Sequence, residues 1–193
     1  MNRVRQPGAR GWARRELSVA DLSAALTALS DKLAARGVSA SIYVVGGAAI
    51  AARHDQRRLT VDVDAAISDP VPVLAAAREV AQEMGLVDDW LNSRATAFMP
   101  SFDLPSPAGP GLTVEYAPDE VLLAMKVLAE RERDVADLVL LVRRLGLTEP
   151  AQVVDIVHDL YPDGWALRMP TDDELLIEAA DILSQARHDV SDR

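Results

Sequence analysis

The sequence predicts an α/β (α+β) protein, with a small mixed sheet in its N-terminal half and helices through its C-terminal half. Two observations carry this prediction. Between residues 18 and 117, short apolar runs typical of strands alternate with stretches of helical periodicity. From Pro118 onward, the apolar residues recur almost entirely at helical spacing.

The first predicted element is a helix over residues 18–36. Ser18 is a suitable N-cap, Asp21 stands at the capping-box offset, and Gly37 ends the helix. Its buried face is a row of leucines: Leu22, Leu26, Leu29 and Leu33. These signals together predict an amphipathic helix that packs on the sheet.

The remaining elements of the first half follow in order. They are a strand at 40–45, a short helix at 48–53, a strand that carries Asp62 and Asp64, a helix at 71–84 closed by Gly85, and a strand at 112–117. A loop rich in proline and glycine, residues 100–111, separates the last strand from the others.

The second half is predicted to be helical, with a helix start at Thr148-Glu149-Pro150. The expected helices are 118–131, 133–145, 148–159 and 171–187. We therefore expect a flexible basic arm at 1–15, an α/β core at 16–117 and a helical subdomain at 118–193 that packs on the core.

Composition limits the possible functions. The 193 residues are 49% hydrophobic and 26% charged, which suits a folded domain with a substantial core. No cysteine is present, so disulfides, thiol catalysis and cysteine-ligated zinc are excluded, and we expect a cytoplasmic protein without a disulfide partner. The apolar runs are too short to span a bilayer, and residues 1–15 contain no signal-peptide core, so no membrane partner is expected.

The charge balance is unfavourable for a generic nucleic-acid binder, because 30 acidic residues stand against 20 basic ones and the net charge is −10. A local positive patch is still compatible with this total. Its candidates are Arg53, Arg57, Arg58, Lys126, Arg131, Arg133, Arg143 and Arg144; the alternative is that these residues pair with acids on solvated helix faces. The three histidines, His54, His158 and His188, are interpreted as surface or cap residues rather than ligands.

Two acids on one strand are the first candidate site. Asp62 and Asp64 alternate with Val61 and Val63, so both carboxylates point to the same face. Adjacent like charges are unfavourable unless they share a cation or a proton, and oxygen ligands of this kind suit Mg²⁺. The alternative is a pair of exposed strand or turn acids.

A glycine turn precedes these acids. Gly46-Gly47 follows an apolar strand and opens an alanine-rich helix, so the backbone there can approach a phosphate group closely. Arg58 and Thr60 stand just before the acids and supply guanidinium and hydroxyl donors. Gly-Gly by itself would equally suit a simple tight turn.

These residues resemble a known family. Gly46-Gly47 followed by Arg58-x-Thr60-x-Asp62-x-Asp64 is similar to the signature of the polymerase-β-like nucleotidyltransferases, in particular the AbiEii and MenT-type toxins, although Thr60 stands where serine is usual. Downstream, a helix lysine at Lys126 and an Arg-Asp-x-x-Asp-Leu segment containing Asp134 and Asp137 resemble the second block of that family. The resemblance covers about half of the chain, residues 43–141.

The resemblance implies roles for particular residues. It implies a catalytic set: Asp62, Asp64, Lys126, Asp134 and Asp137. It implies a set for the nucleoside triphosphate (NTP) that is the donor substrate: Gly46, Gly47, Arg58, Thr60 and Lys126. It also implies Mg²⁺ or Mn²⁺ on Asp62 and Asp64, with Glu115 as the candidate for a third carboxylate.

Some of these roles have alternatives. Lys126 could instead lie along the apolar stripe of its helix with the ammonium group in water. Asp134 and Asp137 lie three apart on one helix face and could instead pair with neighbouring arginines. Glu115 could be an ordinary acid on an edge strand.

The resemblance also implies an activity. The enzyme would transfer NMP from an NTP to the 3′ end of tRNA and release pyrophosphate, which would block growth, and a cognate antitoxin protein would control it. A protein or small-molecule acceptor is the alternative within this class. A non-catalytic nucleotidyltransferase-fold module that binds a partner protein is the alternative outside it.

Overall fold

The computed structural model describes residues 16–54, 59–165 and 167–191. Within these ranges the chain forms seven α-helices, one four-stranded mixed sheet and a helical C-terminal region. The predicted α/β class is therefore confirmed at this level. The arm expected at residues 1–15 lies outside the described residues.

The sheet has the strand order β3-β2-β1-β4. The strands are β1 (Ser39–Val45), β2 (Val63–Ile67), β3 (Leu91–Asn92) and β4 (Gly111–Tyr116). β1 is antiparallel to β2 and parallel to β4, and β3 runs parallel to β2. β1 is thus a central strand, and its end lies beside the start of β2.

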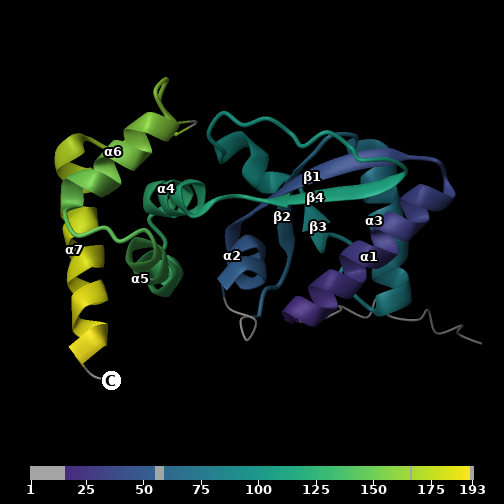
Figure 1. Cartoon of the computed structure of the whole chain (residues 1–193), viewed down its shortest axis with the longest axis horizontal. Coiled ribbons are helices and arrows are strands. Elements are labelled where there is room, and N and C mark those ends of the chain that lie inside the picture. Colours follow the sequence, from purple (N-terminus) through teal and green to yellow (C-terminus); the bar gives the residue numbers. More distant parts are fainter. Residues whose placement is uncertain (1–15, 55–58, 166, 192–193) are drawn as a thin grey trace, which may run out of the picture.

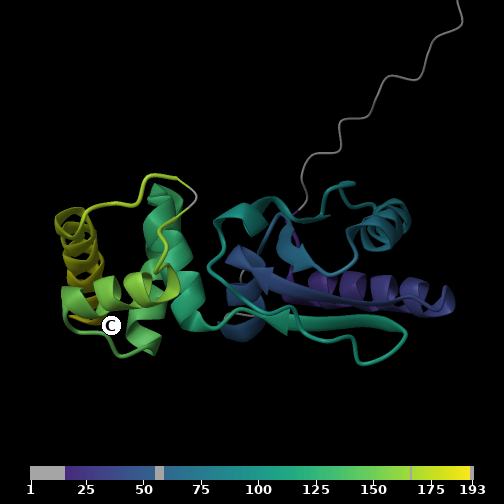
Figure 2. The same cartoon turned by 90° about the horizontal axis from the view of Figure 1, so that it is seen from above.

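Both faces of the sheet are covered. The three helices α1 (Val19–Ala35), α2 (Gly46–His54) and α3 (Pro70–Met84) lie on one face (Figures 1 and 2). The segment between β3 and β4 crosses the other face, where the ring of Phe102 stacks on Tyr43 with centroids 5.3 Å apart. This double cover explains why residues 40–45 of β1 are all buried, rather than every second one.

The first helix forms as the sequence predicts. Ser18 is the N-cap of α1, and its Oγ accepts a hydrogen bond from the Asp21 backbone N–H at 3.1 Å. The Asp21 carboxylate in turn accepts from the Ser18 backbone N–H at 3.0 Å, which completes the capping box. Gly37 follows with a φ of +65°, a left-handed conformation that favours glycine.

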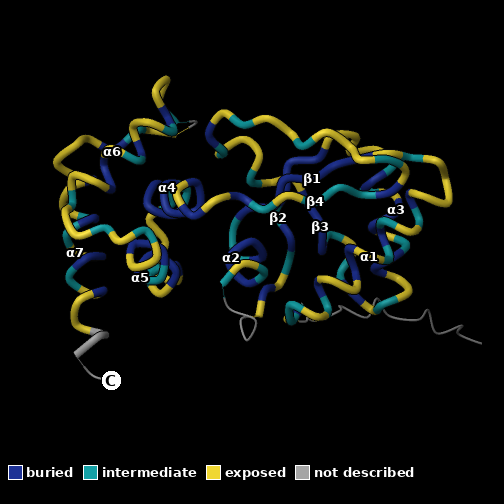
Figure 3. Tube along the Cα trace, viewed as in Figure 1, coloured by how far each residue is buried: buried dark blue, intermediate teal, exposed yellow. Residues whose placement is uncertain are grey.

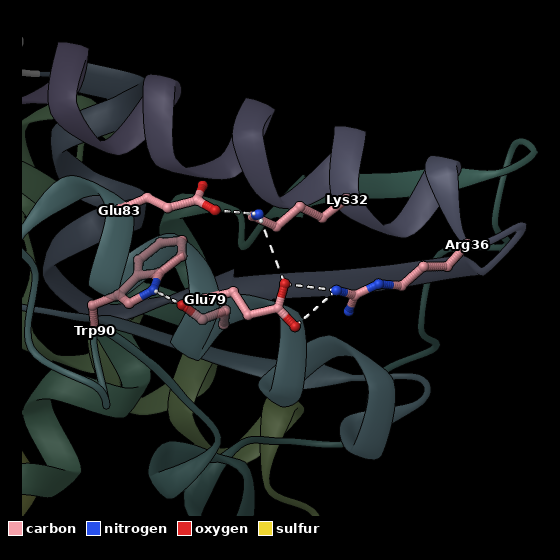
Figure 4. A network of polar contacts seen from close by, with 6 residues as sticks. Lys32, Arg36, Glu79, Glu83 and Trp90 are labelled. Atoms are coloured by element: carbon pink, nitrogen blue, oxygen red, sulfur yellow. Dashed lines mark hydrogen bonds and ion pairs between the residues drawn. The ribbon is translucent and has the colours of Figure 1, made fainter.

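Ion pairs join α1 to α3 on the outer surface (Figure 4). Lys32 Nζ donates to Glu83 at 2.6 Å, and Arg36 donates to Glu79 at 2.6 Å. Beneath them, the buried Trp90 donates from its indole N–H to the carbonyl of Ala77 at 2.9 Å. The ion pairs therefore lie on the outside of the packed helices α1 and α3. The indole N–H of Trp90 is buried beneath them and has a hydrogen-bond partner.

The C-terminal region contains four helices and follows directly from β4 (Figure 1). They are α4 (Asp119–Ala129), α5 (Val135–Arg144), α6 (Pro150–Leu160) and α7 (Asp172–Ser191), with a short 3₁₀ turn, η2 (Glu132–Asp134), before α5. Buried residues line the inner sides of these helices, while their outer sides are exposed (Figure 3). The four helices lie close to their predicted positions.

Two short elements were not predicted. β3 has only two residues, and the 3₁₀ helix η1 (Arg94–Phe98) follows it almost at once. A two-residue strand has no sequence period of its own and exists because β2 supplies its hydrogen-bond partners. Helix α2 also begins earlier than expected, at Gly46, so the two glycines belong to its first turn.

Candidate functional site

A cavity of about 360 Å³ opens where β1 ends and α2 begins. Its walls come from both halves of the molecule: the junction of β1 and α2, the start of β2, the helix η1, and helix α4 with the segment that follows it. Trp165 and Leu167, from the segment after α6, complete the lining. Residues distant in the sequence thus meet at one place.

Asp62 and Asp64 lie together in this lining. Asp64 is in β2 and pairs with Val45 of β1, while Asp62 stands just before the strand. Burial of the Asp64 carboxyl raises its pKa, and the negative charge of Asp62 raises it further. Arg94 and Arg131, together with a hydrogen bond from Asn92, act in the opposite direction but do not cancel the rise. A bound cation would relieve this repulsion.

Gly46 lines the cavity next to Asp64, whereas Gly47, which the resemblance implies as a triphosphate ligand, lies outside the lining. Gly46 has a φ of +67°, and a Cβ atom at that position would lie 3.9 Å from Asp64 Oδ2. Because α2 begins at Gly46, which lines the cavity, the N-terminus of this helix lies beside the cavity. Gly46, Asp62 and Asp64 therefore share one cavity lining.

Thr60 is buried and forms a hydrogen bond with the backbone of Asp62. Its Oγ1 donates to the carbonyl oxygen of Asp62 at 2.9 Å, and its backbone pairs with Leu17 in an isolated antiparallel bridge. A Cβ atom on Gly47 would lie 3.5 Å from the same hydroxyl. Thr60 does not line the cavity, so its hydroxyl orients the acid-bearing segment. The predicted phosphate ligand Arg58 lies outside the described residues.

Lys126, Asp134 and Asp137 form a buried cluster beside the cavity. Lys126 Nζ lies 2.8 Å from Asp134 Oδ1 and 2.8 Å from Asp137 Oδ2. Lys126 and Asp134 line the cavity, whereas Asp137 is 1% exposed and lies behind them. The lysine does not extend into water along its helix, because α4 turns it toward α5 and its two acids.

Glu115 is not brought to the cavity. It is an exposed residue of β4 opposite Tyr43, whereas Asp64 is opposite Val45, two positions further along β1. Burial raises the pKa of Tyr43, and the charge of Glu115 adds to that rise. Among the described residues, no three carboxylate or histidine side chains are grouped so as to hold a metal ion. The described acids at the site are thus Asp62 and Asp64, with Asp134 across the cavity.

Two polar residues of the site were missed in the sequence. Asn92 pairs with Asp64 across β2 and β3, and its Oδ1 accepts from the Arg94 backbone N–H at 3.0 Å. Arg94 lines the cavity with one guanidinium nitrogen 4.0 Å from Asp62 Oδ2, and it also pairs with Asp89. The sequence feature that points to these two residues is the change from apolar to polar residues immediately after Trp90 and Leu91.

The basic residues are divided between the cavity and structural pairs. Arg94, Lys126 and Arg131 line the cavity. Arg53 and Arg144 instead pair with the buried Asp119, so the broad positive patch considered from the sequence is not formed by these two. The charged groups of the cavity lining are thus three cations and the three acids Asp62, Asp64 and Asp134.

The histidines do not line the cavity. His54 ends α2 as expected for a helix end, but its side chain is 3% exposed and pairs with Asp119, so the expectation of a surface position is wrong for it. His158 on α6 is exposed and lies 3.1 Å from Asp172. His188 on α7 is also exposed.

Comparison of the chain with protein-family models, with curated proteins and with solved structures finds no match. None of the helices in the described part of the chain combines the length and the apolar character needed to cross a bilayer. The chemistry of the cavity must therefore be argued from its own residues. It combines paired carboxylates, a glycine-opened helix N-terminus, three cations and an apolar wall.

Proposed function

We propose that this protein is a metal-dependent nucleotidyltransferase that binds an NTP in the cavity beside Asp64. The observation that carries this proposal is the meeting of Asp62, Asp64 and Gly46 in one cavity lining. Paired carboxylates next to a helix N-terminus are a donor set for a divalent cation and for the phosphates that it bridges.

The paired acids fit Mg²⁺ or Mn²⁺. Mg²⁺ is usually held in such sites by one or two carboxylates together with substrate phosphates, so a protein site of two acids is sufficient. Burial and the charge of Asp62 raise the pKa of Asp64, which supports a bound cation at this position. When bound, the metal would neutralise charge on the leaving pyrophosphate and polarise the attacking hydroxyl.

The cations of the cavity would hold the triphosphate. Arg94 and Arg131 are exposed residues of its lining, and Lys126 is a buried lining residue beside Asp134. Guanidinium groups suit phosphate oxygens because they donate in a fixed planar fork. In the reaction, an acceptor hydroxyl would attack the α-phosphorus, the α–β anhydride bond would break, and pyrophosphate would leave while the hydroxyl proton passes to solvent.

The acceptor is proposed from the resemblance to AbiEii and MenT-type toxins. That resemblance favours the 3′ end of tRNA, with growth arrest as the outcome and a cognate antitoxin as the regulator. The net charge of −10 restricts RNA contact to local cations such as those at the cavity rim. We therefore expect weak, salt-sensitive RNA binding outside the site itself.

The test is transfer of label from each of the four α-labelled NTPs to total tRNA in the presence of Mg²⁺. Wild-type protein should label the RNA, and Asp64→Asn should lower the rate at least about a hundredfold, since it removes metal-binding charge from a position needed in the transition state. Asp69→Asn, an exposed acid just beyond β2, is the matched control and should retain activity. Absence of transfer to RNA or protein with every nucleotide would refute the enzymatic proposal.

Growth provides a second readout for the toxin proposal. Expression of the wild type should stop growth of a bacterial host, while Asp64→Asn expressed to the same level should not. Equal growth of the two cultures would contradict the toxin role, but it would not contradict the transferase activity.

One observation favours a second candidate, a non-catalytic module of this fold that binds a partner protein. The third acid proposed from the resemblance, Glu115, is exposed on β4 and outside the cavity lining. A protein that binds Mg²⁺ and NTP without transferring label to any acceptor would fit this candidate.

A further inference from the structure

The cavity has an apolar wall that the proposed metal and phosphate chemistry does not use. The large side chains of Phe98, Trp165 and Leu167 share the cavity lining with Asp62 and Asp64. Phe98 is 38% exposed and Leu167 is 60% exposed, so both leave much apolar surface open to water at the cavity. Side chains of this size are normally covered, and their exposure at a cavity marks a binding surface.

The aromatic part of this wall is held in place by hydrogen bonds. The rings of Phe98 and Trp165 lie 6.0 Å apart at an interplanar angle of 55°. Trp165 donates from its indole N–H to the Phe98 carbonyl at 3.3 Å, and Tyr161 donates from its hydroxyl to the same oxygen at 2.9 Å. The wall thus joins η1 to the end of α6, and its aromatic faces have a defined position before any ligand arrives.

The polar and apolar groups that line the cavity match the two parts of a nucleotide. The paired carboxylates, the helix N-terminus and the arginines suit a metal-bound triphosphate. The two aromatic rings and the aliphatic side chains suit a flat aromatic base. The indole N–H of Trp165 and the Phe98 carbonyl already bond to each other, so stacking rather than base-edge hydrogen bonding is what these groups offer.

We propose that Phe98 and Trp165 bind the nucleobase of the donor NTP by stacking, while Asp62, Asp64 and the cavity cations hold its metal and phosphates. This inference rests on the proposed function, because it assumes that an NTP occupies the cavity. It adds the residues that hold the base and a recognition mode that tolerates all four bases.

The experiment compares a ligand that has a base with one that lacks it. Calorimetric titration with Mg²⁺-ATP or Mg²⁺-CTP is set against Mg²⁺-tripolyphosphate, for the wild type and for Phe98→Leu. The substitution keeps an apolar side chain but removes the aromatic face, so the NTP dissociation constant should rise about 5- to 20-fold. The tripolyphosphate constant should stay within about twofold of the wild type, which also shows that the site remains folded.

Phe102→Leu is the matched control, because Phe102 stacks on Tyr43 and lies outside the cavity lining. It should leave both dissociation constants within about twofold of wild type. An equal loss of NTP affinity in Phe98→Leu and Phe102→Leu would overturn the assignment of the base to this wall.

Tryptophan fluorescence gives a readout that does not depend on the Phe98 substitution. Saturation with NTP should quench the emission of Trp165, tripolyphosphate should not, and Trp165→Phe should abolish the quench. NTP binding without such a quench would overturn the inference and leave the proposed function standing. Binding of neither ligand by the wild type would instead refute the proposed function.

Discussion

Asp119 and His54 are in direct contact and join the two halves of the molecule. His54 Nε2, at the end of α2, lies 2.5 Å from Asp119 Oδ1, at the start of α4. The other oxygen of this carboxylate accepts from Arg144 of α5 at 2.9 Å. Because the walls of the cavity come from both halves, this buried carboxylate helps to set the distance between them.

Asp119→Asn should therefore destabilise the protein. The amide keeps the shape of the carboxylate but loses its charge-assisted bonds, which should lower the free energy of unfolding by about 1–3 kcal/mol. Urea denaturation followed by circular dichroism measures this change. Asp31→Asn, an exposed acid on α1, should change the value by less than about 0.5 kcal/mol. Equal midpoints for Asp119→Asn and the wild type would contradict the structural role.

The contribution of Asp119 should also depend on pH. Burial raises the pKa of Asp119, but hydrogen bonds from His54 and Arg144 outweigh it, so the pKa is lowered from its ordinary value of 3.8. A lowered pKa in the folded state means that the stabilisation is present above the unfolded value and is lost as pH falls through the folded one. The stability gap between wild type and Asp119→Asn should thus persist near pH 5 and shrink below about pH 3.8. A gap that widens on acidification would show that another group is responsible.

Lys126 should be more important to stability than its partner Asp137. Lys126→Met leaves Asp134 and Asp137 as buried neighbours of like charge and should cost about 3 kcal/mol or more. Asp137→Asn leaves Lys126 paired with Asp134 and should cost roughly 1–3 kcal/mol. Chemical denaturation of the two variants tests this order, and the reverse order would mean that Asp137 has a stabilising partner of its own that outweighs Lys126.

The sequence predicted the parts of the site that depend on local periodicity. Alternation placed Asp62 and Asp64 on one side, and the glycine turn after an apolar run located the end of β1. The glycine turn and Asp64 lie close together because β2 runs antiparallel to β1, which places Asp64 opposite Val45 at the end of β1. Helical spacing likewise predicted α4 and α5, which bring Lys126 to Asp137.

What the sequence could not provide was register and long-range packing. Alternation predicts which face of the sheet Glu115 is on, but not its position along the strand relative to the neighbouring strands. Glu115 pairs with Tyr43, two residues before the Val45 position that pairs with Asp64. The sequence predicts the Thr60 hydroxyl as a phosphate donor, but in the fold this hydroxyl donates to the Asp62 carbonyl. The aromatic wall combines Phe98 and Trp165 from distant segments, and no local pattern predicts that they meet.

Gly46→Ala should affect both stability and the site, and Gly37→Ala separates the two effects. Both glycines have left-handed backbones, with φ of +67° and +65°, so an alanine at either position should cost about 1–2 kcal/mol. A Cβ atom on Gly37 would meet no atom within 4 Å, whereas one on Gly46 would lie 3.9 Å from Asp64 Oδ2, at the mouth of the cavity.

The two variants should therefore show similar losses in urea denaturation but different ligand binding. Titration with Mg²⁺-tripolyphosphate should give a dissociation constant at least about fivefold higher for Gly46→Ala, because the added methyl group occupies space where the backbone approaches the phosphates. Gly37→Ala lies at the far end of α1 and should bind like the wild type. If the two variants bind equally well, the Gly46 backbone is not part of the phosphate site and α2 begins at a glycine for conformational reasons alone.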